Sequence, residues 1–172
     1  LGAVVLAITG TEGIYTDISS KMTLGLNPFH YGGGGITSTL NDFLKILQFL
    51  LKSMKAGKKS SIVPQMFRNQ IGNFRISPLK SFNKGLASDY DIYPNIEKSW
   101  GYGLLLNNQP LKTGRSADSG SWAGVLNTYF WVDYRNDLAG VFLTQILPCY
   151  TPSLLKGFEY FEELSYKFLV ES

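Results

Sequence analysis

Residues 122–145 read WAGVLNTYFWVDYRNDLAGVFLTQ, and this stretch decides the expected fold. Aromatic and β-branched residues dominate 122–132 and 138–145, which is typical of strands that contribute to a core. The polar residues 133–137 between the two segments predict a short turn. Consecutive strands joined by a short polar turn form an antiparallel hairpin. The stretch therefore predicts two neighbouring strands of an antiparallel sheet.

The segments around this stretch complete an α+β pattern. A further strand is expected over 100–107, where apolar residues again alternate with period two. Apolar residues with helical spacing predict one helix over 38–56 and a C-terminal helix over 152–170. Residues 57–99 contain scattered Pro, Gly and Asn without a clean period, so we expect a loop-rich excursion there. The whole chain is therefore expected to form antiparallel sheet strands flanked by helices.

Composition excludes several classes of protein. The 172 residues include 44% apolar and 17% charged residues, which indicates a globular domain with a core. The net charge of +3 is spread along the chain, so we expect no nucleic-acid partner. A single cysteine, Cys149, and a single histidine, His30, argue against a disulfide framework and against a Cys- or His-based metal site. We accordingly expect no metal and no cofactor. The sequence does not indicate a cellular compartment.

Two common motifs are absent. The glycines at 32–35 lack the G-K-[ST] ending of a phosphate-binding loop, so nucleotide binding is not expected. A Ser-His-Asp triad would have to use His30, but the sequence has no G-x-S-x-G elbow to supply its nucleophile.

A serine acyl-transfer set is also present as strings of sequence. This chemistry uses Ser and Lys one helical turn apart, a second proton-handling group and an oxyanion-binding strand edge. Ser77–Lys80, Tyr93–Asn95 and Lys112–Gly114 match S-x-x-K, Y-x-N and K-T-G in this order. However, S-x-x-K is expected about once by chance in this composition, and Ser81–Lys84 and Ser153–Lys156 match it as well. Ser77–Lys80 lies in the aperiodic excursion, so we expect this compact set to be coincidental.

Other residues resemble a known family more closely. They resemble the C-terminal half of the class C β-lactamase-related serine hydrolases, in particular the esterase-like branch. That family includes β-lactamases, penicillin-binding-protein-like peptidases, esterases and acyltransferases, and the resemblance covers roughly residues 1–170. The segments that carry it are HYGGGGITSTLNDF at 30–43, WGYGL at 100–104, SGSWAG at 119–124, NTYFWVD at 127–133 and DLAGVFLTQ at 137–145.

The resemblance implies a site on one strand. Trp122-Ala123-Gly124 matches the W-[GA]-G string that replaces K-T-G in the esterase-like branch, and the N–H of Val125 would be one oxyanion-hole donor. Small residues at 123 and 124 would let a substrate carbonyl approach the strand edge, with Trp122 as a wall of the pocket. His30 and Tyr31 match the loop that borders the substrate cleft. The alternative is that Trp122, Tyr129 and Trp131 are core aromatics of a hairpin.

The resemblance also implies what this chain lacks. The family's S-x-x-K helix and Y-x-[NS] loop lie upstream of the region that matches here, so the nucleophilic Ser and its Lys are expected outside this chain. We therefore expect a partial β-lactamase-like domain over residues 1–172, inactive by itself, whose intact protein hydrolyses or transfers the acyl group of a small ester or amide. A catalytically inactive binding or structural module is the alternative. The expected macromolecular partner is the N-terminal half of the fold or a second copy of the chain.

Overall fold

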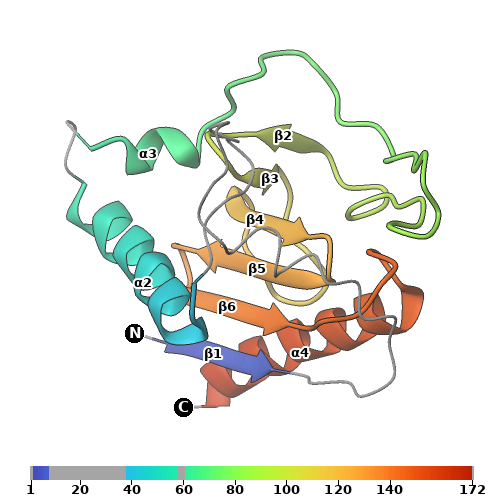
Figure 1. Ribbon diagram of the computed structural model, residues 1–172. Coiled ribbons are helices and arrows are strands. Elements are labelled where there is room, and N and C mark those ends of the chain that lie inside the picture. The colour runs from blue at the N-terminus through green and yellow to red at the C-terminus, as the bar shows by residue number, and fades with distance from the viewer. Residues whose placement is uncertain (1, 8–37, 58–60, 172) are drawn as a thin grey trace, which may run out of the picture.

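The fold is a single six-stranded sheet with helices packed on both faces. We describe a computed structural model of the chain, which covers residues 2–7, 38–57 and 61–171. The strands run in the order β1-β6-β5-β4-β3-β2 across the sheet (Figure 1). Neighbouring strands are antiparallel, except that β1 runs parallel to β6. Their bounds are β1 Gly2–Ala7, β2 Lys98–Trp100, β3 Leu105–Asn107, β4 Ser119–Gly124, β5 Thr128–Asp133 and β6 Leu138–Leu143.

Two helices cover opposite faces of this sheet. Helix α2 (Leu40–Ala56) packs Leu47, Leu50 and Leu51 against one face, where Val132 and Val141 complete the core. Helix α4 (Pro152–Glu171) covers the other face with an aromatic cluster. The members of that cluster include Tyr129, Trp131, Phe142, Phe158, Phe161 and Tyr166. The expected α+β class, with antiparallel strands flanked by helices, is confirmed.

The bounds of α2 follow from its capping residues. The helix begins at Leu40, two residues later than expected, because Thr39 is the N-cap and its Oγ1 accepts the N–H of Asp42 at 3.2 Å. It ends before Gly57, which has φ of 60° and donates its N–H to Met54.

The expected strand over 122–132 is wrong, because this segment contains a reversal. It contributes to two strands, β4 and β5, which pair with each other as a hairpin. The chain turns at residues 125–127, where Asn127 adopts φ of 57° and donates its N–H to the carbonyl of Gly124 at 3.1 Å. Asparagine tolerates this left-handed conformation better than most residues do. Apolar residues continue through the turn, so periodicity alone did not reveal it.

The expected strand over 100–107 is likewise wrong, because this span contains only the last residue of β2, then a turn, then β3. Strands β2 and β3 form a hairpin around Gly101–Leu104, in which Gly103 has φ of 73°. A Cβ atom at Gly101 would lie 1.8 Å from the carbonyl oxygen of Met66, so the close approach here requires glycine. The last expected strand, 138–145, ends at Leu143 because the Thr144 hydroxyl turns to backbone carbonyls of the β4–β5 turn.

The excursion between α2 and β2 contains little regular structure. It includes the short helix α3 (Val63–Met66), with Pro64 in its first turn. In the remainder of the excursion, isolated β-bridges pair Leu79 with Tyr90 and Ala87 with Cys149. Among the described helices, none is long and apolar enough to cross a membrane.

Candidate active-site edge of the sheet

The end of β4 is a sheet edge that no neighbouring strand covers in the described part of the chain. Strand β3 pairs only with residues 119–121 of β4, so residues 122–125 extend beyond it. The carbonyl of Gly124 faces the hairpin, where it accepts the N–H of Asn127. Because backbone groups alternate in direction along an antiparallel strand, those of Ala123 face the open edge, and Val125 follows β4 as the first residue of the turn at 125–127.

A narrow pocket lies beside this edge. Its lining is mostly aromatic and apolar, and the space open to the centre of a water molecule is about 20 Å³, room for one or two waters. Ala123 belongs to its wall, together with Tyr90 and Tyr150, whose rings stack with centroids 4.6 Å apart. The edge therefore combines exposed backbone groups with an adjacent apolar hollow.

The three aromatic residues considered in the sequence lie in different surroundings. Tyr129 and Trp131 are buried core residues on the face covered by α4. Trp122 lies on β4 opposite Phe130, and its ring meets that of Trp100 edge-on at 4.5 Å. The alternative that all three are core aromatics of a hairpin therefore holds for Tyr129 and Trp131, whereas Trp122 is half-buried at the candidate edge.

The turn after this edge is held by the segment that follows β6. The side-chain amide of Asn127, fully buried, donates to the carbonyls of Ile146 and Pro148 at 2.7 and 2.8 Å. The Thr144 hydroxyl lies 2.5 Å from the carbonyl oxygen of Leu126. Sequence reasoning missed both roles, although Asn127 and Thr144 belonged to the segments that carried the family resemblance.

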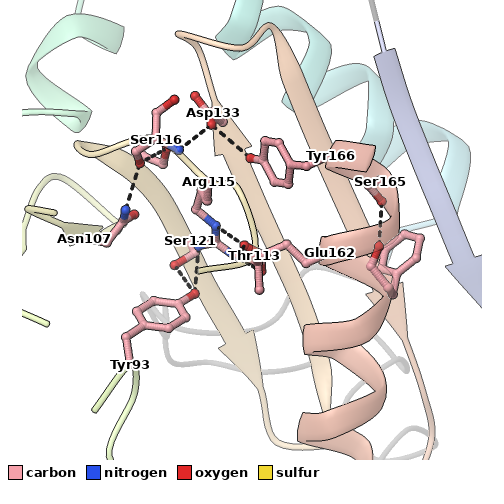
Figure 2. Close-up of polar contacts among 12 residues, drawn as sticks. Tyr93, Asn107, Thr113, Arg115, Ser116, Ser121, Asp133, Glu162, Ser165 and Tyr166 are labelled. Atoms are coloured by element: carbon pink, nitrogen blue, oxygen red, sulfur yellow. Dashed lines mark hydrogen bonds and ion pairs between the residues drawn. The ribbon is translucent and has the colours of Figure 1, made fainter. Parts of the chain in front are cut away.

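A buried polar network supports β4 from the side of α4 (Figure 2). Arg115 binds the Glu162 carboxylate with two hydrogen bonds, of 2.8 and 2.5 Å, and donates a third to the Tyr93 hydroxyl at 2.7 Å. The Tyr93 hydroxyl also lies 3.1 Å from the Ser121 hydroxyl on β4. Burial raises the pKa of Tyr93, with the positive charge of Arg115 acting in the opposite direction. Burial by itself lowers the pKa of Arg115, but the Glu162 carboxylate outweighs that effect, so Arg115 stays charged.

The K-T-G string belongs to this network and not to a strand. Thr113 donates its hydroxyl hydrogen to Glu162 at 2.6 Å, and exposed Lys112 pairs with Glu159 at 3.0 Å. Gly114 has φ of 108° and lies against Tyr166. The string lies in the connection between β3 and β4, in agreement with the expectation that it is not the third-strand motif.

The S-x-x-K strings lie in the excursion before β2 and at the start of α4, and none of their residues lines the pocket beside the candidate edge. Lys80 and Lys84 both approach Asp89, and the hydrogen bond from Lys84 lowers the Asp89 pKa to about 2. Ser153 and Lys156 are exposed in the first turn of α4. Among the three strings of the serine acyl-transfer set, Tyr93 is the residue whose side chain contacts β4, at the Ser121 hydroxyl.

Two predicted site residues, His30 and Tyr31, lie outside the described residues. Within the described ranges, no group of three or more His, Cys, Asp or Glu side chains is arranged to hold a metal ion.

Comparisons with known proteins agree with the sequence resemblance. No family model matches the chain. Lovastatin esterase from Penicillium rubens is 30% identical over 122 residues, which are 69% of this chain and 31% of the esterase.

Solved structures with the same fold include simvastatin synthase LovD from Aspergillus terreus. A LovD6 mutant superposes with a TM-score of 0.64 at 19% identity, over 83% of this chain and 36% of LovD. The unliganded LovD structure gives 0.60 at 18% identity, over 81% and 37%. The chain spans about a third of the length of these relatives. The chain therefore has the β-lactamase-like fold of these structures and resembles the C-terminal part of this family in sequence.

Proposed function

We propose that this chain supplies the oxyanion-binding side of an active site that hydrolyses or transfers the acyl group of an ester or amide. The observation that carries the proposal is the open edge of β4 over residues 122–125, beyond the end of β3. The relatives named lovastatin esterase and simvastatin synthase support ester chemistry for the intact protein. The proposed small-molecule substrate would lie along the open edge, because the pocket beside it has room for only one or two waters.

In the proposed reaction, the backbone N–H of Val125 stabilises the charge that develops on the substrate carbonyl oxygen. A serine from the remainder of the family fold attacks the carbonyl carbon, and its proton passes to a lysine one helical turn away. The resulting oxyanion accepts the N–H of Val125 and that of the serine. Collapse of this intermediate expels the alcohol or amine, which takes up a proton from the lysine–tyrosine pair. Water or a second alcohol then takes the acyl group from the serine.

The other predicted residues have supporting roles in this proposal. Ala123 and Gly124 carry almost no side chain, so a substrate carbonyl can approach the backbone. Trp122 forms a wall, and His30 and Tyr31 border the substrate. The remainder of the family fold, or a second copy of the chain, is the proposed macromolecular partner that covers the edge.

The test uses the protein encoded by the complete reading frame, with a chromogenic short-chain ester and mass spectrometry of the product. We expect a stoichiometric acyl adduct on a serine outside residues 1–172, whereas a peptide of residues 1–172 alone forms none. An adduct on Ser77, or on another serine of this chain, would overturn this assignment.

A substitution pair tests Val125 itself. Val125 follows Gly124 at the second position of the four-residue turn closed by Asn127, a position that accepts proline. Val125→Pro removes the proposed donor, so kcat is expected to fall by about 10²- to 10³-fold. Val125→Ala keeps the N–H and serves as the matched control, with kcat within about threefold of wild type. Equal kcat values for the two variants would contradict the assignment of Val125.

An inactive binding or structural module is the second candidate. The observation that favours it is that, in the described ranges, no lysine lines the pocket beside the open edge of β4. A complete protein that binds a non-hydrolysable ester analogue, yet forms no acyl adduct and turns over no ester, would establish this function.

A further inference from the structure

The turn that carries Val125 is fastened from one side by the segment that follows β6. We infer that Thr144 and Asn127 are positioning residues, which hold the peptide groups of the turn so that the Val125 N–H points to the open edge. The inference rests on the proposed function for its catalytic consequence. The contacts that carry it are independent of that function.

The side-chain amide of Asn127 forms hydrogen bonds through both its nitrogen and its oxygen. Its Nδ2 group donates to the carbonyls of Ile146 and Pro148, at 2.7 and 2.8 Å. Its Oδ1 atom accepts the Tyr129 hydroxyl at 2.8 Å and the Thr151 N–H at 3.2 Å. An amide offers two donor hydrogens and two acceptor lone pairs, so every hydrogen-bonding position of Asn127 is occupied. The left-handed residue that closes the turn is thereby locked to the loop of residues 146–151.

Thr144 holds the turn from the end of β6. Its side chain is buried, and its hydroxyl lies 2.5 Å from the Leu126 carbonyl oxygen and 3.1 Å from that of Asn127. The Ile146 N–H also approaches the Leu126 carbonyl, at 3.4 Å. These contacts hold the Leu126–Asn127 and Asn127–Thr128 peptide planes, and the Asn127 N–H in turn donates to the Gly124 carbonyl at 3.1 Å.

The Val125 N–H shares its peptide group with the Gly124 carbonyl, which accepts the Asn127 N–H at 3.1 Å and lies 3.3 Å from the Cys149 thiol. The Val125 side chain is 44% exposed, so packing does not determine how its backbone is oriented. Peptide groups are planar and rigid, so holding the Leu126 and Asn127 carbonyls restricts the four-residue turn that begins at Gly124 and is closed by Asn127. A backbone donor must lie close to the forming oxyanion, and small displacements reduce catalysis strongly. The position of the proposed donor therefore depends on Thr144 and Asn127, neither of which would touch the substrate.

The test compares Thr144→Val with Thr144→Ser in the complete protein. Valine has nearly the shape of threonine but no hydroxyl, whereas serine retains the hydroxyl. We expect Thr144→Val to lower kcat for a short-chain ester by about 10- to 100-fold, with KM changed less than about threefold. Thr144→Ser should restore most of kcat.

Ser165→Ala is the matched control. Ser165 is buried, and its hydroxyl donates to a backbone carbonyl, that of Phe161, at 2.8 Å, but it lies within α4 (Figure 2). A general loss of stability would lower kcat in Ser165→Ala as much as in Thr144→Val. Equal effects of these two variants, or a Thr144→Ser variant as impaired as Thr144→Val, would overturn the inference.

A second measurement does not need activity. Amide hydrogen exchange over residues 125–127 is expected to become faster in Thr144→Val and to stay unchanged in Ser165→Ala. Unchanged exchange in Thr144→Val would refute the positioning role. If the wild-type protein turns over no ester, the proposed function fails, and hydrogen exchange still decides whether Thr144 holds the turn.

Discussion

Arg115 and Glu162 form an ion pair whose side chains are 0% and 2% exposed. Removing two charges from water costs several kcal/mol for each ion, and good geometry must offset that cost. Here the hydroxyls of Thr113 and Tyr93 complete the hydrogen bonds of the pair. The pair joins the loop before β4 to α4, so its integrity determines how these two parts of the fold are held together.

Breaking this pair on one side is expected to destabilise the protein strongly. Arg115→Met leaves the Glu162 carboxylate buried without its positively charged partner, and the free energy of unfolding should fall by about 3–5 kcal/mol. Urea denaturation measures this change. The exposed pair of Lys112 and Glu159 provides the control, because Lys112→Met should cost less than about 1 kcal/mol. Similar losses in the two variants would show that burial of the pair has no energetic consequence.

At the scale of elements, the packing of β6 depends on glycine at one position. Gly140 pairs with Trp131 across β5 and β6, and the indole ring covers the glycine. A Cβ atom built at Gly140 would lie 2.0 Å from the Trp131 ring. Phe158 and Phe161 of α4 pack edge-on against the same indole, so the ring has little freedom to move.

Adding a methyl group at Gly140 is therefore expected to disturb the contact between β5 and α4. Gly140→Ala should lower the free energy of unfolding by about 1–3 kcal/mol or more. Gly157 in α4 is the matched control, because a Cβ atom there would be 3.7 Å from Phe142, an ordinary contact. Gly157→Ala should leave stability unchanged or raise it by up to about 1 kcal/mol, since alanine favours helices. Thermal unfolding of both variants checks the prediction, and a neutral Gly140→Ala would contradict it.

Elements also show how far sequence patterns predict a fold. Both helices were expected close to their observed bounds, because capping residues and helical spacing are local signals. The strand segments were located but were divided incorrectly. The reversals at Gly103 and Asn127 depend on left-handed backbone conformations, and apolar residues mask both turns. Alternation of apolar residues with period two therefore does not distinguish one long strand from a hairpin whose turn is also apolar.

At the scale of the whole molecule, buried tyrosines couple stability to alkaline pH. Burial raises the pKa of Tyr90, Tyr129 and Tyr166, and it raises that of Tyr150 to about 12. A phenol is neutral when protonated and charged when it loses its proton. The folded state therefore retains protons that the unfolded state releases near pH ~10.

The stability of the protein should consequently decrease as pH rises. The contribution of Tyr150 is complete below pH ~10 and is lost progressively as pH rises to about 12. Following phenolate absorbance and circular dichroism together should show that part of the phenolate signal appears only as structure is lost. Tyr150→Phe should raise the pH of alkaline unfolding, whereas Tyr160→Phe, at a ring that is exposed, should not. If all phenolate signal appeared before any loss of structure, the prediction would be wrong.

The sequence by itself determined the α+β class, the two main helices and the family resemblance. Helix spacing, caps and short motifs act over a few residues, so they can be recognised without contacts between distant segments. The family resemblance implied Trp122–Val125 as the proposed site, and the substitutions at Val125 test its role.

The tertiary structure alone decided which parts of the chain meet at that edge. The end of β4 is open because β3 stops at Leu105, opposite Ser121, which is a matter of strand register. The partners Arg115 and Glu162 are 47 residues apart, and Thr144 reaches Leu126 across 18 residues. Hydrogen bonds between segments so far apart depend on how the sheet and helices pack, and no local pattern of residues records that packing.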